Sequence, residues 1–164
     1  MDLQAWADQE DARIIETIRR VGWFINYIGG ECCSRPGCDS PPDEGPPFAY
    51  TIGLFGLGHP EMLIFGVDTT TAAGVLNALG EHVRHGGTVM PGVVIPVPGW
   101  RRVVPEQVPN PGEIVLWAND FYQRPPEHSV PVIQLTYDDD QGRFPWDEGY
   151  TTPELQPRPG TFTA

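Results

Sequence analysis

Glycine and proline interrupt this chain so often that long regular elements have little room to form. Each occurs 19 times among the 164 residues, which together is roughly double their average usage. Because proline ends helices and glycine weakens them, a helical bundle and a coiled coil are both excluded. Leucine, isoleucine, valine and phenylalanine still supply enough apolar surface for a folded core. We therefore expect one domain over residues 1–150, followed by a proline-rich tail, residues 151–164, that is mobile.

The chain is strongly acidic and contains no lysine. Its 22 acidic residues outnumber 10 basic residues, all of them arginine, and the net charge is −12. This charge disfavours binding to nucleic acid and to anionic membranes, and it favours a basic protein partner. Lysine nucleophiles and lysine-dependent phosphate loops are excluded. The first residues lack the features of a signal peptide, and no apolar run could span a bilayer, so we expect a cytoplasmic location.

Hydrophobic periodicity predicts nine elements in the order helix, three strands, helix, two strands, helix and strand. The clearest is a helix over residues 68–84, with Asp68 or Thr69 as its N-cap and Gly86-Gly87 as its stop. Strands that follow one another without helices between them indicate an α+β fold, a mixed and mainly antiparallel sheet with about three helices packed on it. The remaining elements are expected at residues 3–21, 23–28, 48–55, 62–67, 89–97, 100–104, 110–122 and 130–137.

Two further predictions concern aromatic side chains. Trp117 and Phe121 share one face of the short third helix, and we expect them to be buried with Leu76 and Leu79 of the second helix. In Phe144-Pro145-Trp146 the proline fixes the chain, so that both rings can return to the body of the protein. We favour structural anchoring by these rings over display as an aromatic ligand platform.

All three cysteines lie within seven residues, at Cys32, Cys33 and Cys38. The segment between the last two suits a β-turn that brings Cys33 and Cys38 together and leaves Cys32 apart. Neighbouring thiolates can bind zinc or form a redox pair, and an ordinary solvent loop with incidental cysteines is the simpler interpretation. We expect no cofactor. The alternative is a zinc ion held by Cys33 and Cys38, and less readily by Cys32.

A candidate functional cluster lies outside this loop. His59 is by default a turn residue, and a catalytic base is the alternative. The run Asp138-Asp139-Asp140 is expected to be a solvated turn, although clustered carboxylates can hold a hard cation. The chain has no nucleophile elbow of the serine-hydrolase type. The cluster consists of Tyr50, His59, Glu61, Arg143 and Trp146.

Two stretches of the chain resemble one known family. The first runs from Pro46-Pro47-Phe48-Ala49-Tyr50-Thr51-Ile52-Gly53-Leu54 through Gly58-His59-Pro60-Glu61 to Phe65-Gly66. The second joins Gln134-Leu135-Thr136-Tyr137-Asp138 to Gly142-Arg143-Phe144-Pro145-Trp146. Together they resemble the bacterial domain-of-unknown-function family 4262, in an actinobacterial branch with a Cys-containing loop, over about residues 13–150. The resemblance implies a common fold but no activity, so it assigns no catalytic residue. A looser analogy with the suppressor-of-fused-like superfamily suggests an immunity or partner-binding role.

Two functions from different classes are consistent with these observations. The first is a cytoplasmic, acidic domain that binds another protein, in one version as an immunity-like factor. The alternative is a small metal-binding or redox enzyme with its site near the Cys32–Cys38 loop, Tyr50 and His59. Retention of a basic partner that is lost at high salt would favour the first function, and stoichiometric zinc or iron would favour the second.

Overall fold

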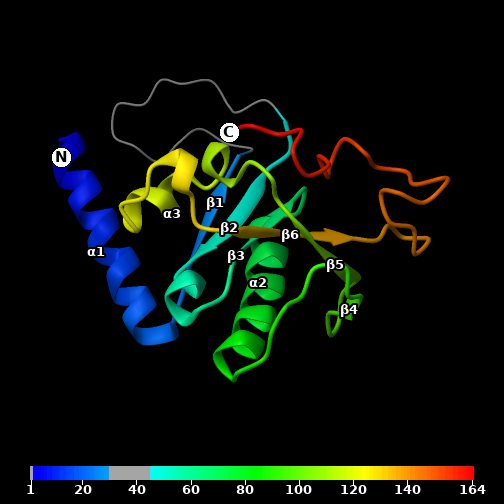
Figure 1. The fold of residues 1–164 in the computed structure, drawn as a ribbon, viewed down its shortest axis with the longest axis horizontal. Helices are drawn as coiled ribbons and strands as arrows, with labels where there is room; N and C mark the ends of the chain where they lie inside the picture. Colours follow the sequence, from blue (N-terminus) through cyan, green and yellow to red (C-terminus); the bar gives the residue numbers. More distant parts are fainter. Residues whose placement is uncertain (1, 30–44) are drawn as a thin grey trace.

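A six-stranded mixed sheet forms the centre of the molecule (Figure 1). The computed structural model describes residues 2–29 and 45–164. The strand order is β1-β2-β3-β6-β5-β4; β3 and β6 are parallel, and the other neighbours are antiparallel. The expected α+β class and the expected order of helices and strands are both confirmed. The strands are β1 (Phe24–Ile28), β2 (Phe48–Ile52), β3 (Glu61–Phe65), β4 (Ile95–Pro96), β5 (Arg102–Gln107) and β6 (Val132–Tyr137).

Three α-helices accompany the sheet: α1 (Leu3–Val21), α2 (Thr69–Arg84) and α3 (Leu116–Phe121). The side chain of Asp68 caps α2 by accepting a hydrogen bond from the Thr71 amide, as the sequence predicted. Gly22 ends α1 with a φ of 111°, a left-handed conformation that glycine adopts at little cost. Within residues 2–29 and 45–164, no helix is long and apolar enough to cross a membrane.

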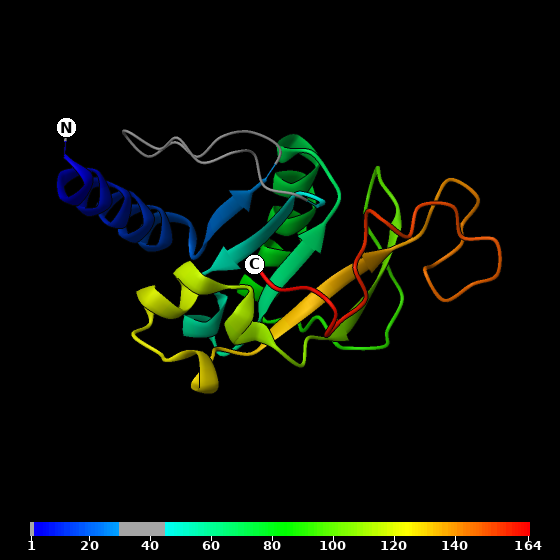
Figure 2. The same cartoon turned by 90° about the horizontal axis from the view of Figure 1, so that it is seen from above.

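Each face of the sheet carries its own hydrophobic core, with α2 on one side and α3 on the other (Figure 2). The prediction that Trp117 and Phe121 pack with Leu76 and Leu79 is wrong. Both leucines belong to the core under α2, whereas the two aromatic rings pack, partly buried, against the core on the opposite face. Helical periodicity shows that a helix has an apolar face, but it does not choose the side of the sheet on which that face is buried.

Proline and glycine shorten two of the expected elements. In place of a strand over residues 89–97, only Ile95–Pro96 pairs with the sheet, because Pro91 and Gly92 form a turn that donates one hydrogen bond to the Pro105 carbonyl. The helix expected over residues 110–122 is divided into a short 3₁₀ turn, Pro111–Glu113, and α3. The sequence itself marks the interruption of the strand by Pro91-Gly92, whereas helical spacing alone did not reveal the division of the helix.

The C-terminal residues run back across the sheet on the face that carries α3. Phe162 packs against Phe48 and Phe65, with ring centroids 5.2 and 5.0 Å apart. Gln156 is buried and hydrogen-bonds to the backbone of Tyr137. Composition alone predicted a mobile tail over residues 151–164; its mobility stays a prediction, and these contacts give the segment a defined course.

The cysteine predictions cannot be placed on this fold. Cys32, Cys33 and Cys38 all lie outside the described residues. The expected pairing of Cys33 with Cys38 therefore stays a prediction.

Candidate functional site

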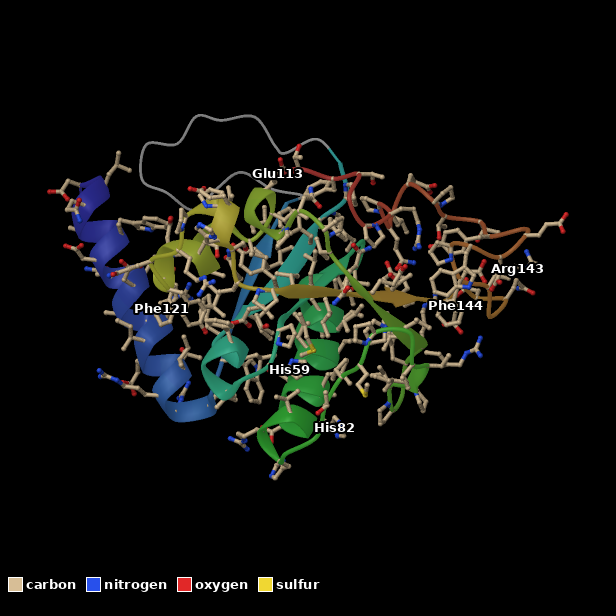
Figure 3. All side chains as sticks on the ribbon, viewed as in Figure 1. His59, His82, Glu113, Phe121, Arg143 and Phe144 are labelled. Carbon is tan, nitrogen blue, oxygen red and sulfur yellow. The ribbon has the colours of Figure 1, made fainter. Side chains whose placement is uncertain are left out.

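The five candidate residues occupy three separate places in the structure. Tyr50 and Glu61 both contact residues of α3 or its C-terminal end. His59 precedes β3 and contacts the chain that follows α2. Arg143 and Trp146 belong to the loop after β6, and Figure 3 shows Arg143 at the opposite end of the molecule from Phe121 of α3. No single site therefore contains all five.

Glu61 is fully buried, yet both of its carboxylate oxygens have hydrogen-bond donors. Oε1 accepts from the amides of Gly53 and Phe55, at 2.8 and 3.1 Å, and from the Tyr122 hydroxyl at 3.1 Å. Oε2 accepts from the Thr51 hydroxyl at 2.5 Å and from a third backbone amide, that of Leu54, at 3.3 Å. These five donors account for the hydrogen-bonding capacity of the carboxylate, so it has none left for a substrate.

The Glu61 carboxylate organises the turn between β2 and β3. Three of its donors are backbone amides at the start of the 3₁₀ turn Leu54–Leu57, where amides otherwise lack partners. Burial raises the pKa of Glu61, and the hydrogen bonds it accepts, that from Thr51 first, act in the opposite direction. Burial also raises the pKa of Tyr122, as does the adjacent Glu61 carboxylate. We interpret Glu61 as a structural residue that fixes this turn.

Tyr50 joins three elements through its hydroxyl oxygen. This oxygen accepts from the side-chain amide of Asn26 at 3.0 Å and from the Trp117 amide at 3.1 Å. The side chain is buried, and burial is the main cause that raises the pKa of its hydroxyl. Tyr50 thereby connects β1 and β2 to the start of α3.

His59 is also buried, with a partner at each ring nitrogen. Nδ1 lies 2.8 Å from the Pro60 carbonyl oxygen, and Nε2 lies 3.1 Å from the Val89 amide. A backbone amide can only donate and a carbonyl can only accept, so Nδ1 carries the proton and Nε2 accepts. His59 braces the segment after α2, which supports the interpretation as a turn residue.

The acidic run after β6 is held by arginines and by the backbone. Asp138 pairs with Arg102 at 2.9 Å and Asp140 pairs with Arg101 at 2.6 Å. Asp139 accepts hydrogen bonds from the amides of residues 141 and 143, and the second of these is the main cause of its lowered pKa. Asp139 therefore has its partners within the turn, whereas Asp138 and Asp140 pair with arginines at or just before the start of β5.

Arg143 and Trp146 play different parts in the loop that follows. Arg143 donates to the Gly149 carbonyl at 2.6 Å and so closes the loop on itself. Phe144 is buried, as predicted, but Trp146 is 49% exposed, so the prediction of burial is wrong for that ring. The two rings stack with centroids 4.9 Å apart and planes 6° apart, so the exposed indole lies against the buried phenyl ring.

Arginines extend this aromatic pair at both ends. The Arg102 guanidinium lies 5.2 Å from the centroid of the Phe144 ring, and that of Arg158 lies 5.3 Å from the centroid of the Trp146 ring. Both distances suit cation–π attraction. The four side chains thus form a continuous series, Arg102, Phe144, Trp146 and Arg158, that fixes the position of the exposed indole.

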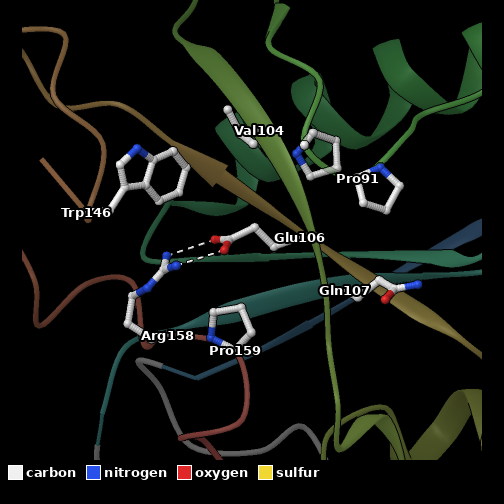
Figure 4. A pocket seen from close by; sticks show the side chains of 9 residues that line it. Pro91, Val104, Glu106, Gln107, Trp146, Arg158 and Pro159 are labelled. Carbon is white, nitrogen blue, oxygen red and sulfur yellow. Dashed lines mark hydrogen bonds and ion pairs between the residues drawn. The ribbon is translucent and has the colours of Figure 1, made fainter.

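A groove of about 590 Å³ opens beside Trp146 (Figure 4). Arg158 lines it and binds Glu106 through two hydrogen bonds of 2.8 Å each. Sequence reasoning missed Glu106 and Arg158. The one available signal was a single arginine between two prolines in an otherwise uncharged stretch of the tail, residues 155–164. The other residues lining the groove are Pro91, Gly92, Val104, Pro105, Gln107 and Pro159.

The described ranges 2–29 and 45–164 contain no group of three or more histidine, cysteine, aspartate or glutamate residues placed to hold a metal ion. The acidic run at residues 138–140, considered as a possible cation site, is thus not such a group. The cysteine loop is not part of these ranges.

The comparisons with known proteins identify one family. A family model described as domain of unknown function DUF4262 matches residues 17–151. Comparisons with curated proteins and with solved structures found no match. Trp146 and Glu106 lie within the matched range, whereas Arg158 and Pro159 lie beyond it.

Proposed function

The chain belongs to the DUF4262 family, whose description assigns no activity, and we propose that it is a protein-binding module for a basic partner. The observation that carries this proposal is the half-exposed Trp146 ring at the edge of the groove. An aromatic ring that is held rigidly and left partly exposed loses little entropy on binding, and tryptophan is enriched at the centres of protein interfaces.

The charge of the protein supports a basic partner. The net charge of −12 accelerates encounters with positively charged proteins. Within the candidate functional cluster, Tyr50, His59 and Glu61 already bond to the protein itself, which favours binding over chemistry for the described part of the chain.

A capture experiment with three proteins tests this function. Tagged wild type, Trp146→Ala and Leu57→Ala would be incubated with lysate from cells of the source organism. Leu57 is the matched control, because it is an apolar side chain with the same 49% exposure but lies in the turn before β3. We expect wild type and Leu57→Ala to retain the same basic protein, and Trp146→Ala to retain at least tenfold less.

Two further measurements complete this test. Raising the salt concentration should weaken retention, because salt screens the attraction between opposite charges, and the purified partner should bind wild type by calorimetry. Equal retention by all three proteins, with thermal unfolding unchanged, would overturn the proposal.

The proposal includes a cytoplasmic location, which cell fractionation tests. Its most specific form is an immunity-like factor that sequesters a basic toxin. A toxin gene next to this gene, with toxicity relieved by co-expression, would support that form.

The alternative function is a small metal-binding or redox enzyme that uses Cys33 and Cys38. Elemental analysis of the purified protein tests it. About one zinc or iron per chain, lost in a Cys33→Ser variant, would favour the enzyme over the binding module.

A further inference from the structure

The C-terminal segment, residues 152–164, lies on the sheet in the manner of a bound peptide. It contains no strand or helix, and side chains make many of its contacts with the sheet. The buried amide of Gln156 both donates to the carbonyl and accepts from the amide of Tyr137, each at 3.0 Å. It thereby satisfies two backbone groups at the end of β6.

An arginine provides the second point of attachment. Arg158 forms the paired hydrogen bonds with Glu106 described above, and the Gln134 side chain donates to the Pro157 carbonyl at 2.8 Å. Glu106 also accepts from the Thr136 hydroxyl at 2.6 Å. A paired arginine–carboxylate contact of this kind is directional and selects arginine over lysine.

A phenylalanine provides the third point of attachment. The Phe162 ring meets the rings of Phe48 and Phe65 edge to face, at 5.2 and 5.0 Å. Its carbonyl accepts from the Asn110 side chain at 2.8 Å, and the amide of the last residue, Ala164, donates to a backbone carbonyl at 2.9 Å. Edge-to-face rings add to the gain from burying apolar area.

Each of these contacts joins a residue of the body of the protein to a residue of the C-terminal segment. The family model matches the first group of residues and not the second. The contact residues on the body of the protein all lie within the matched range 17–151, and Gln156, Arg158 and Phe162 all lie outside it. We define the cleft by the receptor residues Phe48, Phe65, Glu106, Asn110, Gln134 and Tyr137.

We propose that this cleft binds an extended segment of the protein partner that carries an arginine four residues before an aromatic residue, and that the chain's own C-terminal segment occupies the cleft until the partner displaces it. This inference rests on the proposed protein-binding function and names the recognition chemistry. A carboxylate at one end and an aromatic pocket at the other select such a segment, and the carboxylate fits the basic partner inferred from the net charge.

A labelled peptide corresponding to residues 152–164 tests the cleft with the full-length chain. In wild type the attached segment competes at high effective concentration, so the peptide should bind weakly. Replacing Arg158→Gln and Phe162→Ala together in the chain weakens that competitor. We expect the peptide to bind this double variant at least tenfold more tightly than wild type, as measured by fluorescence anisotropy.

Controls on both sides make the result specific. A chain with Glu154→Gln, an exposed residue in the same segment, should bind the peptide as weakly as wild type. A peptide with its arginine replaced by glutamine should bind the double variant at least tenfold less tightly than the original peptide. If the double variant does not fold, the single variant Arg158→Gln replaces it, with an expected gain of at least threefold.

Two outcomes would overturn this proposal. One is a folded variant that binds the peptide no better than wild type, which would make the segment an ordinary part of the core. The other is a wild-type dimer in light scattering that Phe162→Ala abolishes, which would assign the cleft to a second copy of the chain. In either case, capture that depends on Trp146 would still test the proposed function separately.

Discussion

At the scale of single residues, the hydrogen-bond partners of a buried polar side chain indicate its role in this protein. Glu61 and His59 both belong to the candidate functional cluster, and a catalytic base is the alternative interpretation of His59. Glu61 accepts from five donors, and His59 has a partner at each ring nitrogen. Both therefore stabilise local structure, and their contributions can be measured.

Replacing Glu61→Gln should destabilise the protein by about 2 kcal/mol or more, because the amide group places an N–H against donors that need an acceptor. Urea unfolding at neutral pH measures this loss. Glu113→Gln is the control, since Glu113 is exposed and its carboxylate accepts one hydrogen bond, from the Asn110 side chain, and it should change stability by less than about 0.5 kcal/mol. An unchanged urea midpoint for Glu61→Gln would contradict the structural role.

The His59 ring should carry its proton on Nδ1. The Val89 amide donates to Nε2, and the Pro60 carbonyl accepts from Nδ1, so the usual preference between the two nitrogens has no influence here. NMR of the ring nitrogens in labelled protein checks this assignment. A proton found on Nε2 of the folded protein would show that the contact with Val89 is wrong.

At the scale of elements, α2 shows how packing overrides helix propensity. Gly80 is buried against Trp23, and a Cβ at this position would lie 2.7 Å from two atoms of the indole ring. Gly74, in the same helix, is exposed, and a Cβ there would meet nothing within 4 Å. Comparing the two glycines therefore separates the effect of helix propensity on stability from the effect of the space available for a side chain.

We expect opposite effects when each glycine is replaced by alanine. Gly74→Ala should stabilise the protein by up to about 1 kcal/mol, because alanine is the better helix former. Gly80→Ala gains the same propensity but incurs overpacking of about 1–3 kcal/mol, so a net loss of about 1 kcal/mol is expected. Thermal and urea unfolding of both variants measure the difference, and a stabilised Gly80→Ala would show that the indole can move aside.

At the scale of the whole molecule, the C-terminal segment connects parts of the sheet that are far apart in the sequence. Phe162 meets two strands of one core, and Arg158 meets Glu106 near the sheet edge. The conformation of residues 152–164 therefore depends on contacts with the whole face of the sheet, and the composition of the segment does not determine it.

Chymotrypsin cleavage after Phe162 should be slow in the wild-type protein, since the ring is packed against the core. The same bond in a free peptide of residues 152–164 should be cut at least tenfold faster. Arg158→Gln should give an intermediate rate, because it removes the ion pair and leaves the ring contacts in place. Equal rates for the wild-type chain and the free peptide would confirm the tail as mobile.

The sequence by itself determined the order of the elements, the α+β class and the family. The helix cap at Asp68, the stop at Gly22 and the short runs of apolar and β-forming residues in the strands are encoded within a few residues, so local patterns are enough to recognise them. The strong negative charge is likewise a property of composition alone.

Only the tertiary structure decided which of these features meet. Trp117 could not be assigned to a face of the sheet from its helix, and the partners of Glu61 and Arg158 come from other elements. Trp146 remains half exposed because its ring stacks on Phe144 and on an arginine twelve residues further along. Such contacts depend on how distant segments are brought together in space, and neither residue type nor local periodicity contains that information.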